Sequence, residues 1–478
     1  MSSSVAVSSP SASLRSSPAS PRRSARPSRG EELELSVESL AYGGNGVARR
    51  DGYVVFVAGG VPGDRVRAVV GKAKRAYAEA RVVEVLEPSP DRIPEVAHHP
   101  GAAWQVLPYE RQLEVKAEQV AEALSRIGRL EGFELEPIVP ALEQWRYRNK
   151  LEYSFGAGDA GELVCGFHAP GRFDRIVPLT DCKLASERGN ELREQVLAEC
   201  RRQGLGAWDR REQRGFLRNL VVREGRRTGQ FQVRLVTSPG ELDVDALIDA
   251  LPCQGLLWTQ TAGLGESTQG GETMLLSGSP QLQERLGDLD FLISPEAFFQ
   301  TNTEMAELLY SAAADMAQLR GHERVFDLYS GIGTIALTLA ARAREVVGVE
   351  LAEPAVADAI ENARLNEVTN ASFYAGDIRL AMRELVERAG RPDLAVIDPP
   401  RAGLSQKVVR RIVEAAPKRI VYVSCNPTTL APNAAQLVEA GYRLTRVRPI
   451  DLFPQTPHIE CVALLEAGPD GVRNPDRD

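Results

Sequence analysis

The stretch D-L-Y-S-G-I-G-T spans Asp327–Thr334 and joins two segments of different periodicity. The run Arg324–Leu328 before it predicts a buried strand, and the run Ile335–Ala340 after it is typical of a helix. Glycines in such a turn, among them Gly331, let the backbone approach a ligand closely at the N-terminus of the helix. The sequence therefore predicts a strand–turn–helix unit that binds a ligand.

More strands follow this unit at helix-length intervals. The candidates are Glu345–Glu350, Ser372–Ala375, Leu394–Ile397, Arg419–Ser424 and Arg443–Pro449. Strands that alternate with helices predict a doubly wound, mostly parallel α/β sheet, whose last strand pair can be antiparallel. We assign residues 291–478 to this Rossmann-like domain.

The N-terminal part of the chain has a different composition. Residues 1–30 are rich in Ser and Pro and contain five Arg and no acid, which predicts a disordered basic tail; a transit peptide has the same composition. Residues 31–90 show short alternating runs broken by Gly-rich turns, which predict a small antiparallel, OB-like β-barrel. Six basic residues and one acid between Arg65 and Arg81, with Tyr77 among them, would bind RNA or form a solvated loop.

Residues 91–290 predict a linker helix over Tyr109–Arg126 and a central α+β domain. Nine Arg and three acids lie between Arg201 and Arg227, which suits either an RNA-contacting surface or a solvated helix face. The length of 478 residues suits such a division into several domains.

The overall composition excludes several classes of protein. No apolar run approaches the roughly 20 residues that a membrane span requires. The six cysteines are scattered without a C-x-x-C pair, which disfavours a disulfide framework and a zinc ribbon and predicts no metal site. Their scatter fits a reducing, cytoplasmic location, while a net charge of -8 argues mildly against a protein that coats nucleic acid.

Three acidic residues end successive predicted strands, where doubly wound sheets bind their ligands. Glu350 is placed to accept the ribose hydroxyls of a nucleoside, and Asp377 is placed to accept from an adenine amino group. Asp398 begins the loop D-P-P-R, Asp398–Arg401, whose two prolines hold it extended. A nicotinamide dinucleotide site is the alternative, disfavoured because the third glycine of that motif is absent; the loop alone could also be a simple rigid turn.

Arg401 stands where enzymes that methylate exocyclic amines have an aromatic residue. A guanidinium there suits a phosphate or a polar base edge better than a stacked adenine.

Cys425 and Glu460 are the candidate catalytic residues. Cys425, in S-C-N-P, directly follows an apolar strand and therefore lies at the same edge as the ligand-binding loops, although a buried cysteine is often only a small hydrophobe. Carbon 5 of uracil is a poor nucleophile, and addition of a thiolate at carbon 6 would activate it. The carbon 5 proton must then be removed by a base, for which Glu460 at the start of a buried strand is the candidate; a structural ion pair is the alternative.

With these residues in view, the chain from Glu31 to Leu465 resembles the RNA 5-methyluridine methyltransferase family, particularly its bacterial 23S ribosomal RNA members. Ser39–Ala48 and Phe56–Asp64 are similar to that family's TRAM domain. Further similar runs are Trp145–Lys150, Ser294–Asn302, D-L-Y-S-G-I-G-T, D-P-P-R-A-G, V-S-C-N-P and F-P-Q-T-P-H-I-E.

The resemblance implies that Gln300, Tyr329, Glu350 and Asp398 contact S-adenosylmethionine, with Asp377 nearby, and that Cys425 is the nucleophile and Glu460 the base. The expected protein is a monomeric RNA (uracil-5-)-methyltransferase acting on ribosomal RNA, or on transfer RNA as the nearest alternative. Cytosine-5 methylation and an inactive RNA-binding protein are weaker alternatives.

One departure from the family concerns iron. Many members hold a four-iron, four-sulfur cluster through three cysteines before the linker helix and a fourth in the central domain. Here Ile93–Trp104 contains no cysteine, and only Cys182 stands at the fourth position, so no cluster is expected. His98 and His99 are expected to be surface or packing residues.

Overall fold

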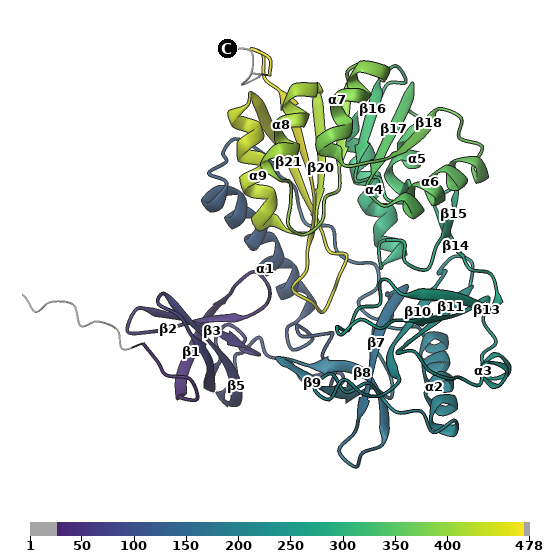
Figure 1. Cartoon of the computed structure of the whole chain (residues 1–478). Helices are drawn as coiled ribbons and strands as arrows, with labels where there is room; N and C mark the ends of the chain where they lie inside the picture. The colour runs from purple at the N-terminus through teal and green to yellow at the C-terminus, as the bar shows by residue number, and fades with distance from the viewer. Residues whose placement is uncertain (1–25, 473–478) are drawn as a thin grey trace, which may run out of the picture. The chain divides into compact units, whose positions relative to one another are not determined.

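The computed structural model describes residues 26–472, with the side chain of Phe173 excepted. The predicted basic tail, and with it the question of a transit peptide, lies outside this range except for its last five residues. The described chain forms two compact units (Figure 1): one contains residues up to Ala41 and from Asn45 to Pro90, and the other contains Tyr42–Gly44 and all residues from Asp91 onward.

The smaller unit is a closed barrel with the strand order β1-β2-β3-β5-β4. Alternate residues point inward, so Leu33, Leu35 and Val37 of β1 contribute to its core. The strands are β1 (Glu32–Leu40), β2 (Gly46–Arg50), β3 (Tyr53–Ala58), β4 (Arg65–Ala73) and β5 (Tyr77–Glu87). The prediction of an all-antiparallel barrel is wrong for one pair, because β5 inserts between β3 and β4 and runs parallel to β3.

The larger unit contains a seven-stranded sheet, in the order β13-β12-β11-β10-β7-β8-β9. The apolar residues on one face of this sheet pack with those of α2 (Glu187–Arg202) and α3 (Val244–Ala250). Its strands are β7 (Lys150–Ala157), β8 (Leu163–Ala169), β9 (Arg172–Pro178), β10 (Leu217–Glu224), β11 (Phe231–Thr237), β12 (Gly255–Gln260) and β13 (Glu272–Gly278).

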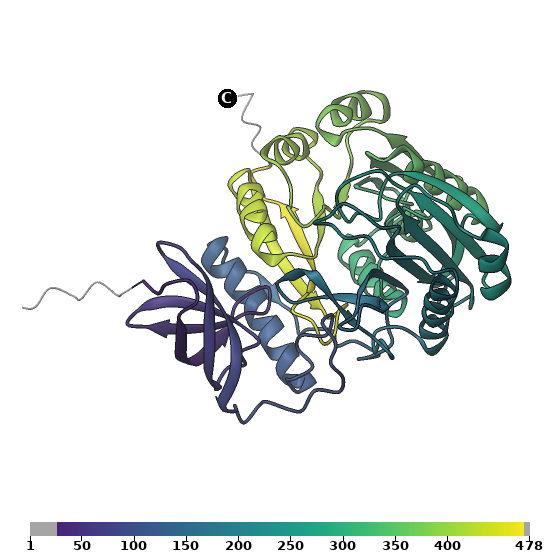
Figure 2. The ribbon, with the colours of Figure 1, turned by 60° about the horizontal axis from the view of Figure 1, so that its bottom comes forward.

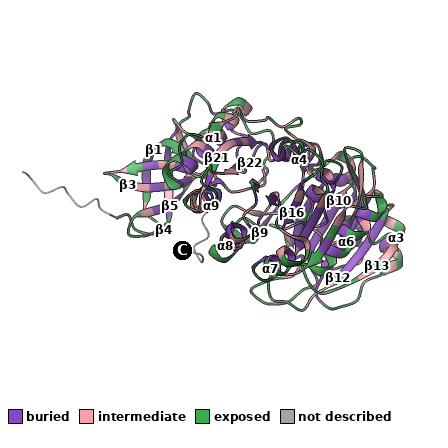
Figure 3. Ribbon diagram, turned by 90° about the horizontal axis from the view of Figure 1, so that it is seen from above, coloured by how far each residue is buried: buried purple, intermediate pink, exposed green. Residues whose placement is uncertain are grey.

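Six of the nine Arg residues between Arg201 and Arg227 are exposed, so an RNA-contacting surface on this segment stays a prediction, but two of them cannot contribute to it. Arg218 and Arg223 are each only 3% exposed, because β10 is buried on both faces (Figure 3). The Arg223 guanidinium donates to the carbonyl of Ala297, and Arg227 pairs with Glu307. These Arg side chains therefore bind the sheet to neighbouring segments.

The larger unit also contains an eight-stranded sheet, in the order β18-β17-β16-β19-β20-β22-β21-β6. Strands β18 through β20 are parallel, and β22 is antiparallel to both of its neighbours. The bounds are β6 (Glu134–Leu135), β16 (Arg324–Leu328), β17 (Glu345–Glu350), β18 (Ala371–Ala375), β19 (Leu394–Ile397), β20 (Arg419–Ser424), β21 (Tyr442–Ile450) and β22 (Glu460–Ala467). The predicted doubly wound sheet, including its antiparallel end, is confirmed.

Helices cover both faces of this sheet. One apolar cluster joins it to α4, α5 and α6, and a second cluster joins its other face to α1, α7, α8 and α9. The helices are α1 (Tyr109–Glu122, extended by a π-helical turn, Ala123–Ile127), α4 (Thr303–Ala317), α5 (Thr334–Ala340), α6 (Glu353–Leu365), α7 (Ile378–Ala389), α8 (Gln406–Ala415) and α9 (Pro427–Glu439). A hairpin of β14 (Leu282–Leu286) and β15 (Leu289–Ile293) precedes α4.

The segment before the seven-stranded sheet completes the edge of the eight-stranded one. β6 pairs in parallel with β21, and Glu136 just beyond β6 binds the side chains of Arg446 and Arg448 on β21. The edge of β21 is therefore covered by chain from far upstream.

No helix among residues 26–472 is both long enough and apolar enough to cross a membrane.

The substitution Gly166→Ala tests the pairing of β8 with β9. A Cβ at this position would lie 1.9 Å from the carbonyl oxygen of Val177, which is backbone and cannot rotate away. We expect Gly166→Ala to destabilise the fold by about 1–3 kcal/mol or more, seen as a lower Tm in calorimetry.

Gly206→Ala is the matched control, because a Cβ there meets nothing within 4 Å. Equal Tm values for the two variants would contradict the β8–β9 register.

Candidate active site

The turn after β16 lies where the strand order of the sheet reverses, since β17 flanks β16 on one side and β19 flanks it on the other. Tyr329, Gly331 and Gly333 have φ values of 67°, 53° and 87°. The backbone N–H groups of Tyr329 and Ser330 both donate to the carbonyl of Val349, at 2.9 and 3.1 Å. A left-handed conformation is costly for a tyrosine, roughly 1–2 kcal/mol, and such strain is typical of functional turns.

Glu350 closes this turn from the end of β17. One of its carboxylate oxygens accepts from the N–H of Gly331 at 3.2 Å, and the other accepts from the N–H of Ala352 at 2.9 Å. The structure thus brings together the glycine and the acid that the sequence assigned to one nucleoside site.

Asp377 and Gln300 are the other two residues that the resemblance assigns to the cofactor. Asp377 caps α7, and both of its carboxylate oxygens accept from the guanidinium of Arg379, which holds the pKa of Asp377 below its usual range. An adenine amino group would have to share these oxygens with Arg379. Gln300 precedes the N-cap of α4 and is only 5% exposed. Its backbone carbonyl accepts a hydrogen bond from the side chain of Asn149 at 2.8 Å.

Asp327 and Asp398 are the strongest electrostatic feature of the turn. Asp327 is 1% exposed, and neither of its carboxylate oxygens has a hydrogen-bond partner among the described residues. Burial and the charge of Asp398 raise the pKa of Asp327 to about 7, and removal from water raises that of Asp398, which is partly accessible at the edge, to about 7 as well. Buried acids without partners suit a cationic ligand, so the site fits a sulfonium and an ammonium group.

Asp327 was missed as a site residue by sequence reasoning. The motif placed it in a strand, and only the tertiary structure reveals that its oxygens lack partners.

The register of β20 and β22 juxtaposes the two candidate catalytic residues. Val423 lies opposite Val462, and Ser424 lies opposite Cys461, so the next step of the same antiparallel register places Cys425 across from Glu460. Side chains directly opposite each other in such a pair lie about 5 Å apart at Cβ. Cys425 is half-buried, whereas Glu460 is 2% exposed and its Oε2 has no hydrogen-bond partner among the described residues.

Both groups hold their protons tightly. Burial, then the charge of Asp398, raises the pKa of Glu460 well above its usual range. Burial, then Glu460 and Asp398, raises the pKa of the Cys425 thiol to about 11, and the cation of Arg401 opposes this rise. The thiol is therefore protonated at neutral pH until further positive charge enters the site.

Arg401 links the loop after β19 to the cysteine loop. Its carbonyl accepts from the Asn426 side chain at 3.0 Å, and its exposed guanidinium lies 3.4 Å from both ring nitrogens of His458. Burial, then Arg401, lowers the pKa of His458 to about 4, so this imidazole is neutral at physiological pH. The Arg401 guanidinium thus lies beside the neutral His458 ring, and its charge acts on both Cys425 and Glu460.

The position of the missing iron–sulfur ligands is occupied by packed side chains. The Nε2 of His99 lies 3.2 Å from the Sγ of Cys182, both residues are buried, and burial lowers the pKa of His99 to about 4; His98 is exposed. No group of three or more His, Cys, Asp or Glu residues within the described range could hold a metal ion.

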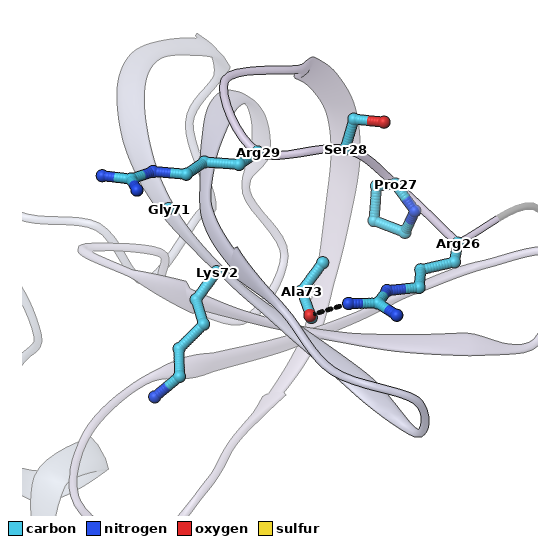
Figure 4. Close-up of a pocket in the computed structure, with 7 residues that line it drawn as sticks. All are labelled: Arg26, Pro27, Ser28, Arg29, Gly71, Lys72 and Ala73. Atoms are coloured by element: carbon cyan, nitrogen blue, oxygen red, sulfur yellow. Dashed lines mark hydrogen bonds between the residues drawn. The ribbon is translucent and has the colours of Figure 1, made fainter.

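A hollow of about 470 Å³ lies on the barrel (Figure 4). Arg26, Arg29 and Lys72 line it without any acid, and Arg26 donates to the carbonyl of Ala73. The predicted basic strip is partly neutralised, because Arg65 pairs with Glu34 and Glu87, and Lys72 of the hollow lies 3.9 Å from Glu79. The remaining cations of this hollow suit a phosphate group.

Comparison with known proteins agrees with this geometry. The family described as tRNA (Uracil-5-)-methyltransferase matches residues 281–468, and the TRAM domain matches residues 27–83. Proteins named as uncharacterized RNA methyltransferases are similar over nearly the whole chain. That of Halalkalibacterium halodurans is 37% identical, covering 91% of this chain and 96% of its own length; that of Gloeobacter violaceus is 39% identical, covering 91% and 97%.

A solved structure is also similar over most of the chain. It is the Pyrococcus abyssi tRNA (uracil-54, C5)-methyltransferase in complex with S-adenosyl-L-homocysteine, which is 28% identical and has a TM-score of 0.75. The match covers 90% of this chain and 99% of that one.

Asp327→Asn tests the electrostatics of the turn. Because the charged forms of Asp327 and Asp398 attract a cation, we expect affinity for S-adenosylmethionine to fall as pH drops from 8 to 6. At pH 8 the variant should bind about 10-fold more weakly by titration calorimetry, which corresponds to about 1.4 kcal/mol.

The same variant should gain stability. A carboxyl whose pKa is raised on folding stabilises the folded protein less as pH rises from about 4 through about 7. Over this range the unfolded state has already lost the proton, which the folded state still retains. Asp327→Asn should therefore have a higher Tm than the parent at pH 8 and no such advantage at pH 4. The exposed Asp245→Asn is the control, and a pH-independent difference would contradict the assignment.

Proposed function

Because this chain belongs to the RNA (uracil-5-)-methyltransferase family, we propose that it methylates carbon 5 of a uridine through a covalent adduct on Cys425, with Glu460 as the base. The methyl donor of the family is S-adenosylmethionine. The proposal depends chiefly on one observation, the β20–β22 register, which pairs Ser424 with Cys461 and whose next step sets Cys425 opposite Glu460.

Cys425 acts first in the proposed reaction. Its thiolate adds to carbon 6 of the uracil ring, the 5,6 double bond is lost, and the electron pair moves towards carbon 5 and the carbonyl at carbon 4. S-adenosylmethionine would supply the methyl group that carbon 5 accepts, and the electron pair of the broken sulfur–methyl bond would remain on its sulfur as a neutral thioether. Arg401 stabilises the anionic forms, because it is the cation that opposes the raised pKa of the thiol.

Glu460 completes the reaction. It removes the carbon 5 proton, the 5,6 double bond forms again, and the Cys425 sulfur is expelled as a thiolate. Its raised pKa makes it a stronger base than an exposed carboxylate once it is ionised, and its unpartnered Oε2 is available to accept the proton.

Three groups share the cofactor site in this proposal. The turn from Tyr329 to Gly331 and the carboxylate of Glu350 hold the nucleoside, and the buried acids Asp327 and Asp398 attract the charged methionine end. Gln300 and Asp377 border the same region.

Ribosomal RNA is the proposed substrate. The resemblance of the motifs to 23S ribosomal RNA members supports it, together with the cationic hollow on the barrel. Transfer RNA is the second candidate, favoured by the similarity to the Pyrococcus abyssi enzyme. Mass spectrometry of both RNA classes from a deletion strain decides, since only the true substrate loses a 5-methyluridine.

RNA containing 5-fluorouridine tests the covalent mechanism. Fluorine at carbon 5 cannot leave as a proton, so the enzyme should stall as a methylated protein–RNA adduct that survives a denaturing gel. Cys425→Ala should form no adduct, whereas Cys253→Ala, in the loop between α3 and β12, should form it normally. An adduct on Cys425→Ala would overturn the mechanism.

Glu460→Gln tests the second half of the reaction. On RNA with ordinary uridine, this variant should accumulate the methylated adduct and release product about 10²–10⁴-fold more slowly than the parent. Rapid turnover by Glu460→Gln would assign the base to another residue.

A further inference from the structure

The segment that delivers Glu460 is a mostly buried connection, Asp451–Ile459, between β21 and β22. Its ends are held together because Ile450 pairs with Glu460. The Glu460 carboxylate has no hydrogen bond to fix its Oε2 among the described residues. The position of this carboxylate therefore depends on the backbone that leads to it.

Helix α1 supplies the hydrogen bonds that this buried connection requires. The side chain of Gln112, which is fully buried, accepts from the N–H of Gln455 at 2.9 Å and donates to the Gln455 side chain at 2.8 Å. The N–H of Trp104, in the segment before α1, donates to the carbonyl of Gln455 at 2.9 Å. Both backbone groups of Gln455 are thus bonded to the α1 region.

A buried ion pair anchors the start of the same connection. Lys116 of α1 and Asp451 are both completely buried, with Nζ and Oδ1 2.6 Å apart, and Nζ also donates to the carbonyl of Phe453 at 3.1 Å. Tyr109 donates to the other oxygen of Asp451 at 3.0 Å. In Figures 1 and 2, α1 runs beside α9.

Gln455 has a conformation that needs this support. Its φ of 65° lies in the left-handed region, which a side chain with a Cβ adopts only when its surroundings impose it. The contacts with Gln112 and Trp104 impose it here. Without them the turn would relax, and the backbone leading to His458 and Glu460 would move.

We propose that Gln112 and Lys116 are positioning residues for proton abstraction, because they hold the connection that sets Glu460 opposite Cys425. The inference rests on the proposed function. Thiolate addition and methyl acceptance require Cys425 and the cofactor turn, to which neither Gln112 nor Lys116 is hydrogen-bonded, whereas removal of the carbon 5 proton requires Glu460 within hydrogen-bond reach. Displacement of a catalytic group by about 1 Å can cost about 10²-fold in rate.

Gln112→Leu is the test variant, since it removes the hydrogen bonds and keeps a similar volume. Single-turnover reactions would use the RNA that the deletion strain leaves unmethylated, with a labelled methyl group. We expect the methylated adduct to form within about 3-fold of the parent rate and to release product at least about 10-fold more slowly. Glu110→Gln, on the exposed side of α1, should match the parent in both steps.

Equal slowing of both steps, or slowing of neither, would overturn the inference. If Gln112→Leu does not fold, Tyr109→Phe gives the same comparison, because it removes one hydrogen bond to Asp451 and retains the ring. Failure of the parent to form an adduct with 5-fluorouridine RNA would instead contradict the proposed function itself.

Discussion

The antiparallel strand β22 is the constraint on which the site depends. A purely parallel sheet would bring only the residues that follow each strand to its ligand-binding edge. Because β22 runs in the opposite direction between β20 and β21, its first residue, Glu460, arrives at the same edge as the residue that follows β20. The proposed nucleophile and the proposed base thus come from neighbouring strands with a single register relation between them.

The charge balance of the site follows from the same geometry. Asp327, Asp398 and Glu460 are gathered with little water around them, and Asp398 raises the pKa of both of the others. A cationic ligand would relieve this repulsion and lower the three pKa values together with that of the Cys425 thiol. In the proposed function, binding of the cationic cofactor would therefore be electrostatically coupled to the ionisation of Cys425 and Glu460.

The sequence predicted much of this structure because its local signals were strong. Apolar β-branched runs located β16 to β21 within one or two residues, and the chemistry of uracil together with the family resemblance pointed to Cys425 and Glu460 as candidates. Local pattern could not reveal what depends on distant partners. The parallel β3–β5 pair, the burial of Arg218 and Arg223, and the bonds of Gln112 to Gln455 all depend on tertiary contacts between segments far apart in sequence.

The short strand β6 has a consequence for the order in which the protein is built on the ribosome. Its partner β21 lies more than three hundred residues downstream. The ion pairs of Glu136 with Arg446 and Arg448 join segments separated by the same interval. Domains generally fold during synthesis from the N-terminus onward. The segment around Glu136 cannot form these pairs until nearly the whole polypeptide has been synthesised. The larger unit can therefore reach its final fold only after translation is almost complete.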